Sequence, residues 1–390
     1  MWDCCGLYEH AGSGNDMKTQ KGESELKICF DARMISSSGI GTQVQNVLRL
    51  LVDRPDVRLH LLGDPREIFR HLPGFSGRIT EFKSSIYSIS EQLFFPRPAP
   101  DEILHIPHYN APIRFLNRSV IVLHDLIHLQ STQFAGPHYR IYAYILLWLV
   151  ARFARRVATV SDTTRREFLS RFPKAAARTS LVYNGIDHTL LGPPAKTAVK
   201  EFRKAYSLPN RFLLVIGIGK RHKNVDFVIR ALAREWKSGR CKLPLVLGGT
   251  GGKIPDYIRI TLEREGVADR LIVMPYLKNE ELPLLYAAAT LFILPSLYEG
   301  FGFPLVEAMA CGTPAIASRT SCMPEIGGDA ARYFDPHDAE SFLETMYAIE
   351  KDKAAQQAMV KAGLKRAKDF DWSRHEDELV AVYNSAIARS

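Results

Sequence analysis

The sequence has few cysteines and no long apolar run. Its six cysteines form no Cys-x-x-Cys pair and no metal-ligand spacing, which argues against the common zinc motifs and for a reducing compartment. No stretch reaches the roughly 18 consecutive apolar residues of a transmembrane helix, and the N-terminus lacks the basic and apolar segments of a signal peptide. We therefore expect a cytoplasmic protein without a membrane span.

Acidic residues are scarce in the first half of the chain. Residues 25–195 hold 21 Lys and Arg against 14 Asp and Glu, whereas residues 196–390 hold 28 against 24. This excess suits a partner with phosphates or an anionic membrane surface, although solvated arginine-rich faces would explain it equally well. The basic residues are scattered, and zinc-finger and RNA-recognition motifs are missing, so nucleic acid is not an expected partner.

A chain of 390 residues is long enough for two or three domains. Short apolar strands alternate with helical stretches in both halves, which predicts an α/β fold of doubly wound parallel sheets with ligand sites at the carboxyl ends of the strands. We expect a disordered tail at 1–24, a first domain at 25–193, a second at 194–370 and a terminal helix within 371–390. The proline-containing residues 65–100 are expected to be irregular.

The most informative stretch, residues 291–317, is typical of strand, loop, helix, turn and strand. The loop and the helix that follows carry two glycines and two carboxylates: Glu299, Gly300, Gly302 and Glu307. Backbone N–H groups at a helix start, approached through glycines, suit a phosphate, and carboxylates suit hydroxyl groups. A sugar nucleotide offers both. A structural turn with solvated carboxylates is the alternative.

Residues 295–314, Pro-Ser-Leu-Tyr-Glu-Gly-Phe-Gly-Phe-Pro-Leu-Val-Glu-Ala-Met-Ala-Cys-Gly-Thr-Pro, resemble the donor-site signature of glycosyltransferase family four, retaining enzymes of GT-B fold. Glu299 and Glu307 stand eight positions apart, as the family's glutamates do. The resemblance implies two Rossmann-like domains facing a cleft, with the nucleotide-sugar donor on the C-terminal domain and the acceptor on the N-terminal one. It also implies a terminal helix that crosses back to the N-terminal domain, and chemistry without a metal or another cofactor.

Further motifs fit the same resemblance. A strand and glycine turn lead into Ile218-Gly219-Lys220-Arg221-His222-Lys223, where basic side chains suit a departing diphosphate. Lys223 matches the family's lysine, but Ile218 stands where the family has arginine. We expect Lys220 to supply that charge, with Arg221 as the substitute and a solvated surface loop as the alternative.

Two loops of the first half complete the expected site. Gly39-Ile40-Gly41 resembles the family loop that faces the donor diphosphate and the acceptor, although a simple tight turn would look the same. His124 directly follows an apolar strand, and the resemblance places it beside the reacting sugar. A lone histidine is otherwise more often structural.

The resemblance also assigns roles in the second half. Glu299 would bind donor sugar hydroxyls, beside Gly300, Phe301 and Gly302, and Glu307 the nucleotide ribose. Tyr276 follows the strand that cradles the base.

Among family branches the motifs look most like bacterial enzymes of O-antigen and other surface polysaccharides. GDP-mannose is the first donor expected and a UDP-hexose the second, with a glycan or lipid-linked acceptor. A sugar-nucleotide epimerase or phosphorylase, or a non-catalytic binding protein, stays open. Apolar residues 141–150 lie between arginines and predict a buried helix or, alternatively, peripheral contact with the inner membrane.

Overall fold

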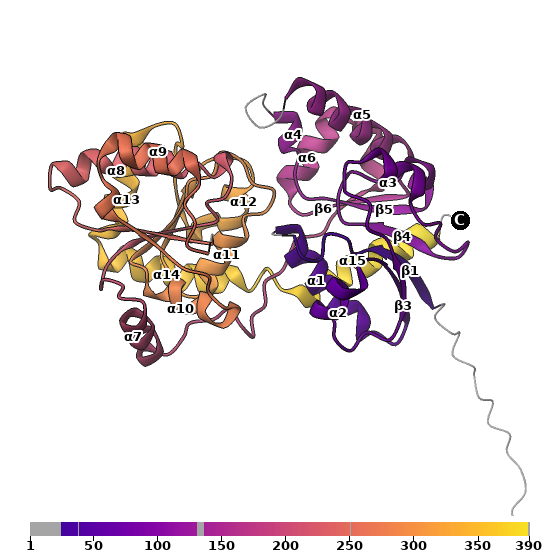
Figure 1. Ribbon diagram of the computed structural model, residues 1–390, viewed down its shortest axis with the longest axis horizontal. Coiled ribbons are helices and arrows are strands. Elements are labelled where there is room, and N and C mark those ends of the chain that lie inside the picture. Colours follow the sequence, from indigo (N-terminus) through magenta and orange to yellow (C-terminus); the bar gives the residue numbers. More distant parts are fainter. Residues whose placement is uncertain (1–24, 38, 131–135, 250, 389–390) are drawn as a thin grey trace, which may run out of the picture.

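The computed structural model describes residues 25–37, 39–130, 136–249 and 251–388, so the expectation of a disordered tail at 1–24 lies outside the described residues. The chain forms two lobes, each built around one parallel sheet (Figure 1). The first sheet falls within residues 25–193 and the second within 194–370.

The first sheet has seven strands in the order β3-β2-β1-β4-β5-β6-β7, and every pairing is parallel. The strands are β1 (Leu26–Asp31), β2 (Val57–Gly63), β3 (Arg78–Glu81), β4 (Ile103–Ile106), β5 (Ser119–Leu123), β6 (Arg156–Thr159) and β7 (Thr179–Leu181). The helices of this half are α1 (Gly39–Val52), α2 (Pro65–His71), α3 (Ile89–Phe94), α4 (Ile127–Gln130), α5 (Pro137–Phe153) and α6 (Asp162–Arg171), with the 3₁₀ helices η1 (Ile113–Arg118) and η2 (Pro173–Arg178).

The second sheet has six parallel strands in the order β10-β9-β8-β11-β12-β13. They are β8 (Leu213–Ile216), β9 (Leu245–Gly248), β10 (Leu271–Val273), β11 (Leu291–Leu294), β12 (Ala315–Ser318) and β13 (Arg332–Phe334). The helices are α7 (Lys196–Ala205), α8 (Val225–Lys237), α9 (Asp256–Glu265), α10 (Leu282–Ala288), α11 (Phe303–Ala310), α12 (Met323–Gly327), α13 (Ala339–Glu350), α14 (Lys353–Ala367) and α15 (Trp372–Ile387). Short 3₁₀ helices are η3 (Arg221–Lys223), η4 (Ala268–Arg270), η5 (Asn279–Glu281) and η6 (Gly328–Ala330).

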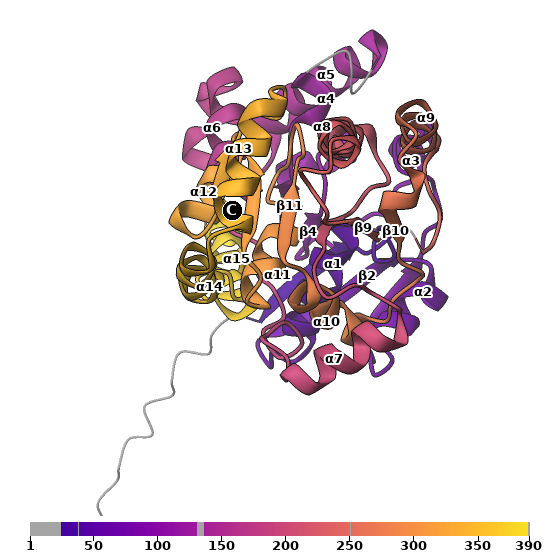
Figure 2. The same cartoon turned by 90° about the vertical axis from the view of Figure 1, so that its left-hand side faces the viewer.

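Helices cover both faces of each sheet, which confirms the predicted doubly wound α/β class. In the second lobe α8, α9 and α13 pack on one face and α10, α11 and α14 on the other (Figure 2). In the first lobe α1 and α2 cover one face, and α5 and α6 cover the other. Central strands such as β5 and β11 are therefore buried along their whole length, as continuous apolar runs require.

The expectation that residues 65–100 are irregular is wrong. This segment contains α2, β3 and α3. Its prolines flank elements rather than interrupt them: Pro65 opens α2, where the missing N–H has no helical partner, and the Asp64 carboxylate accepts from the backbone N–H of Arg66 at 3.0 Å. Ser88 caps α3 in the same way.

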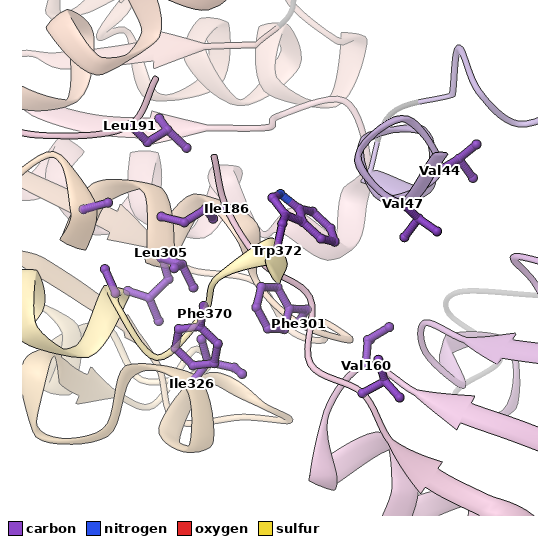
Figure 3. Packing of buried hydrophobic residues seen from close by; sticks show 14 of the residues in the cluster. Val44, Val47, Val160, Ile186, Leu191, Phe301, Leu305, Ile326, Phe370 and Trp372 are labelled. Atoms are coloured by element: carbon purple, nitrogen blue, oxygen red, sulfur yellow. The ribbon is translucent and has the colours of Figure 1, made fainter. Parts of the chain in front are cut away.

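The last helix, α15, leaves the second lobe and packs against α1 and the strands β4, β5 and β6 of the first. Its Tyr383 hydroxyl lies 2.7 Å from His105 Nδ1, and His375 Nδ1 lies 2.6 Å from the Tyr183 carbonyl oxygen. Where the chain crosses, the N–H of Ile186 donates to the carbonyl of Phe370 at 3.1 Å (Figure 3). The segments around Ile186 and Phe370 therefore cross between the lobes next to each other.

Candidate functional site

The loop between β11 and α11 holds the predicted donor motif. Gly302 caps α11 with φ of +85°, a left-handed conformation that favours glycine, and a Cβ there would meet the Met323 side chain at 2.9 Å. Pro304 follows in the first turn. The loop therefore leads directly into the N-terminus of α11, as predicted.

Glu299 of this loop forms an ion pair with Lys223, which lies in the loop after β8. Lys223 Nζ lies 2.5 Å from Glu299 Oε1, which also accepts from the Ser296 hydroxyl at 2.7 Å. The backbone N–H of Glu299 donates to the Ser321 hydroxyl at 3.0 Å. The carboxylate and the ammonium, which come from two different strand-to-helix loops, are thus held in one place and are both largely shielded from solvent.

Glu307 lies one turn inside α11, next to Tyr286. The Tyr286 hydroxyl donates to Glu307 Oε2 at 2.7 Å. Burial raises the pKa of Glu307, while this hydrogen bond and the charge of Lys223 act in the opposite direction. Both glutamates are therefore near Lys223, and the carboxyl group of Glu307 is partly desolvated.

The basic loop after β8 stands beside the donor loop. The N–H of Leu297 donates to the carbonyl of His222 at 2.7 Å, which ties the two loops together. Lys220 is exposed, and the Tyr257 hydroxyl donates to its carbonyl oxygen at 3.3 Å. Arg221 instead places its guanidinium 5.9 Å from the Tyr257 ring. Ile218, at the family's arginine position, is buried.

His124 lies at the end of β5, where the first lobe meets the donor loop. A Cβ on Gly300 would fall 1.8 Å from the His124 carbonyl oxygen, so only glycine fits this contact between the lobes. Burial lowers the pKa of His124 to about 4, with a further contribution from His108. Its Nε2 is buried and has no hydrogen-bond partner among the described residues. His124 is thus a neutral imidazole at neutral pH.

The glycines of the first lobe have different surroundings. Gly41 lies in the first turn of α1, and a Cβ there would come within 2.8 Å of the Ile35 carbonyl oxygen. Gly39 opens α1 with free space around it, so its backbone is accessible from outside. Residue 38, just before it, is outside the described residues.

Two predicted donor residues have contrasting positions. The Phe301 side chain is buried and packs against Phe303 and Phe370, with ring centroids 5.1 and 5.4 Å from its own. Figure 3 shows Phe301 beside Phe370. Only its backbone is therefore available to a ligand. Tyr276 is 78% exposed, and its Cβ lies 3.7 Å from where a Cβ on Gly251 would stand. It offers an open aromatic face beside a glycine turn.

The sequence interpretation missed the residues that join the lobes across the site. The Tyr298 hydroxyl accepts from the N–H of Leu126 at 3.2 Å and donates to Glu167 Oε2 at 2.7 Å. The Glu325 carboxylate accepts from the N–H groups of Asp162 and Thr163 at 2.6 and 2.7 Å. Tyr298 lies in the donor loop and Glu325 on α12, and periodicity alone does not indicate that either has a partner in another domain.

Potential metal ligands do not gather around the donor loop in the described part of the chain. The sequence holds one Asp-x-Asp triplet, Asp369 to Asp371, but Asp369 pairs with Arg366 at 2.9 Å and Asp371 caps α15. Two other groups of close donor atoms lie in the first lobe: Cys29, His60 and Glu102, and Asp31, Glu91 and His108. In the latter group the Arg33 guanidinium already occupies the cation position, 2.6 Å from both carboxylates.

Glycosyltransferases are among the known proteins with sequences similar to this chain. The family model for "Glycosyltransferase Family 4" matches residues 37–190, and that for "Glycosyl transferases group 1" matches residues 199–366. The chain is 29% identical to the O-antigen chain mannosyltransferase B of Escherichia coli, over 74% of this chain and 75% of that protein. It is 27% identical to the serotype-specific mannosyltransferase WbdA of Escherichia coli, over 74% of this chain but only 35% of that protein.

A solved structure of HepE from Anabaena in complex with UDP and glucose superposes with a TM-score of 0.72 at 19% identity, covering 92% of this chain and 100% of that one. This likeness shows the GT-B fold, and the family models disfavour an epimerase, a phosphorylase or a non-catalytic protein. Since two glycosyltransferase models match most of the chain, one on each lobe, the chain belongs to glycosyltransferase family four.

Proposed function

We propose that this chain is a retaining, metal-independent hexosyltransferase that uses a nucleotide-diphosphate sugar. The observation that carries the proposal is the ion pair of Lys223 and Glu299, at 2.5 Å, beside the N-terminus of α11. The Lys223 ammonium can bind a phosphate and the Glu299 carboxylate can bind sugar hydroxyls, so that one sugar nucleotide could contact both. No other cofactor is needed for this transfer.

Departure of the diphosphate requires positive charge at the leaving oxygen. Lys223 and Lys220 supply it, together with the N–H groups at the start of α11, which carry the positive end of the helix dipole. These groups do the work that a divalent cation performs in other phosphate chemistry. We assign the backbone of Gly39 and Gly41 to the same diphosphate from the opposite lobe.

The remaining site residues hold the sugar and the nucleoside. Glu299 accepts hydrogen bonds from donor hexose hydroxyls, and Glu307 from the nucleotide ribose. His124 is assigned a place beside the reacting sugar as a neutral group, which avoids repelling an oxocarbenium-like transition state. The backbones of Gly300, Phe301 and Gly302 line the donor loop, and Tyr276 lies beside the nucleobase.

The donor is proposed to be GDP-mannose, with a UDP-hexose as the second candidate. The relatives named above as mannosyltransferases support mannose, and the UDP complex of HepE supports the second. The acceptor is proposed to be a growing glycan or lipid-linked saccharide of a surface polysaccharide, reached from the cytoplasm.

A contact with the inner membrane is part of this proposal. No described helix is long and apolar enough to cross a bilayer. On α5 one face is buried, but Ile141, Tyr144, Ile145 and Trp148, at spacings of three and four residues, are all exposed. The expectation of a buried helix therefore holds for only one side of α5.

A second apolar strip lies on α3, and the residue that follows this helix, Phe95, belongs to the same core cluster as the buried residues of α5. Ile89, Leu93 and Phe94 are exposed there. Residues 103–161, which include α5, hold six arginines and a single acidic residue, Asp125. Exposed apolar rows with an almost purely basic background match the apolar and anionic layers of a bilayer surface.

Calorimetric titration with GDP-mannose and UDP-glucose, without added metal, tests the donor site. Glu307→Ala removes the proposed ribose contact and is expected to weaken binding by roughly ten- to a hundredfold, the range for lost hydrogen bonds to a charged group. Glu344→Ala, an exposed carboxylate on α13, is the matched control. Equal binding by Glu307→Ala and the wild type would contradict the assignment.

A further inference from the structure

An aromatic cluster on the first lobe stands where the two lobes meet. The Tyr87 ring is 46% exposed, and its centroid lies 5.9 Å from Tyr109, 6.3 Å from His128 and 6.4 Å from Tyr142. The Tyr109 hydroxyl and His128 Nδ1 are 2.7 Å apart. Three tyrosines and a histidine thus form one surface with an open ring at its edge.

A buried polar network holds the backbone of Tyr87. Glu91 accepts from the backbone N–H of Tyr87 at 3.0 Å, from the Asn110 amide and from Arg33 at 2.6 Å. The Tyr142 hydroxyl donates to Asn110 Oδ1 at 2.6 Å. Ionic and amide groups that share one buried site in this way make the backbone around Tyr87 rigid.

The backbone of Tyr87 is strained as well. Its φ is +67°, a left-handed conformation that a tyrosine rarely adopts and that costs about 1–3 kcal/mol. Strain of this kind persists where the surrounding structure imposes it, and it is commonest at ligand sites. Here the strained residue is also the exposed member of the aromatic cluster.

The cluster adjoins the donor site. His128 follows shortly after His124 and Asp125 in the sequence. The donor loop contacts these two residues through Gly300. Burial and Lys220 both lower the pKa of His128, so that lysine of the diphosphate loop lies within electrostatic reach. Asp125, whose carboxylate accepts from the N–H of Ile127 at 3.0 Å, lies beside the donor loop, with its Cβ 3.0 Å from where a Cβ on Gly300 would stand.

We propose that Tyr87, with Asp125 and His128, forms the acceptor subsite, in which the apolar face of a neutral sugar ring stacks on Tyr87 and its hydroxyls reach the two polar side chains. Aromatic faces with a few convergent polar groups are typical of small-ligand sites. Because unpaired anions are disfavoured next to a carboxylate, the ligand is a neutral saccharide rather than a phosphate. This inference rests on the proposed function and adds the acceptor to it.

Saturation-transfer NMR of the full chain tests the subsite. Methyl α-mannopyranoside and an α-linked mannobiose serve as neutral probes and glycerol phosphate as the anionic probe, each with GDP or UDP present to occupy the donor site. We expect transfer to the saccharides and none to glycerol phosphate. Tyr87→Gly, which removes the ring and suits the positive φ, should weaken the saccharide signal about tenfold or more, while Tyr87→Phe retains most of it.

The matched control is Tyr139→Ala, which removes another exposed tyrosine (59% exposed) from α5. Nucleotide binding by each variant shows that it is folded. Saccharide binding that is equal in the wild type and Tyr87→Gly would overturn the inference, as would a wild type that binds nucleotide but neither saccharide. Loss of nucleotide binding in the wild type would instead contradict the donor assignment.

Discussion

The Glu325 carboxylate caps the N-terminus of α6 from the opposite lobe. It accepts from the N–H groups of Asp162 and Thr163, and the Thr163 hydroxyl donates to it at 2.7 Å as well. An anion at a helix N-terminus satisfies N–H groups that lack helical partners and interacts favourably with the dipole. This contact holds the lobes together beside the donor loop.

Glu325→Ala should therefore favour a more open arrangement of the lobes. The loss of a charged cap costs about 1–2 kcal/mol, which would raise the radius of gyration in small-angle scattering without nucleotide and raise KM more than it lowers kcat. Asp329→Asn removes a nearby exposed charge without crossing between the lobes and should change neither quantity. Identical scattering for Glu325→Ala and the wild type would show that the cap does not hold the lobes.

The two basic candidates in the loop after β8 make different predictions. Lys220 is exposed near Asp125, whereas Arg221 packs over the Tyr257 ring. Lys220→Ala should lower kcat by about 10²-fold or more, since it removes charge from the leaving diphosphate, and Arg221→Ala by much less. Steady-state kinetics with the donor identified by calorimetry decides between them. A larger loss for Arg221→Ala would reverse the assignment.

Transfer should not depend on a divalent cation. Lys220, Lys223 and the start of α11 supply the positive charge that a metal would bring. Diphosphate release is expected to continue at an unchanged rate after dialysis against EDTA, and added magnesium or manganese should not raise it more than about twofold. A rate that falls with EDTA and returns with one metal would contradict metal independence.

Acid should destabilise the packing of α15 on the first lobe. Burial lowers the pKa of His375 to about 4, with a hydrogen bond to Tyr183 in opposition. Because the folded-state pKa lies below the ordinary value of about 6.5, protonation favours unfolding: the stability is present above about pH 6.5 and is lost as the pH falls toward 4. At 1.36 kcal/mol per pKa unit, this is about 3 kcal/mol.

Urea unfolding between pH 7 and 4.5 measures this effect. His375→Gln keeps a donor for the Tyr183 carbonyl but cannot titrate, so its free energy of unfolding should fall less steeply with decreasing pH. His138→Gln, on the exposed start of α5, is the control. Parallel pH profiles for His375→Gln and the wild type would exclude His375 as a source of acid sensitivity.

The apolar rows on α5 and α3 should bind anionic vesicles. Trp148 is 48% exposed, and burying its ring in a bilayer interface contributes more than any other side chain of the row. Trp148→Ser is expected to reduce co-sedimentation with phosphatidylglycerol vesicles about tenfold, and phosphatidylcholine vesicles should bind weakly. Ile260→Ser, an exposed apolar residue on α9, should behave as the wild type. Binding that survives Trp148→Ser unchanged would rule out α5 as the contact.

The sequence allowed the sheets and the donor loop to be predicted because their signals are local. Buried strands are continuous apolar runs, and Gly302, Pro304 and Gly312 delimit α11 within one short segment. The two halves of the Lys223–Glu299 pair were each identified, but their 2.5 Å contact depends on neighbouring loops of a folded sheet.

What could not be predicted depends on distant partners. Glu325 was not identified from the sequence, since its partners on α6 lie some 160 residues earlier. Phe301 belongs to the donor motif, yet its side chain packs on Phe370, which no local spacing indicates. Tyr87 lay in a segment expected to be irregular, and its positive φ has no sequence signal comparable to a glycine.

The path of α15 determines when the first lobe can complete its packing during synthesis. The face of the first sheet near His105 is covered by Tyr383, which is synthesised after the whole second lobe. The first lobe therefore emerges with part of its apolar surface bare and stays so until the final helix is made. The second sheet, in contrast, can close as soon as its own strands have emerged.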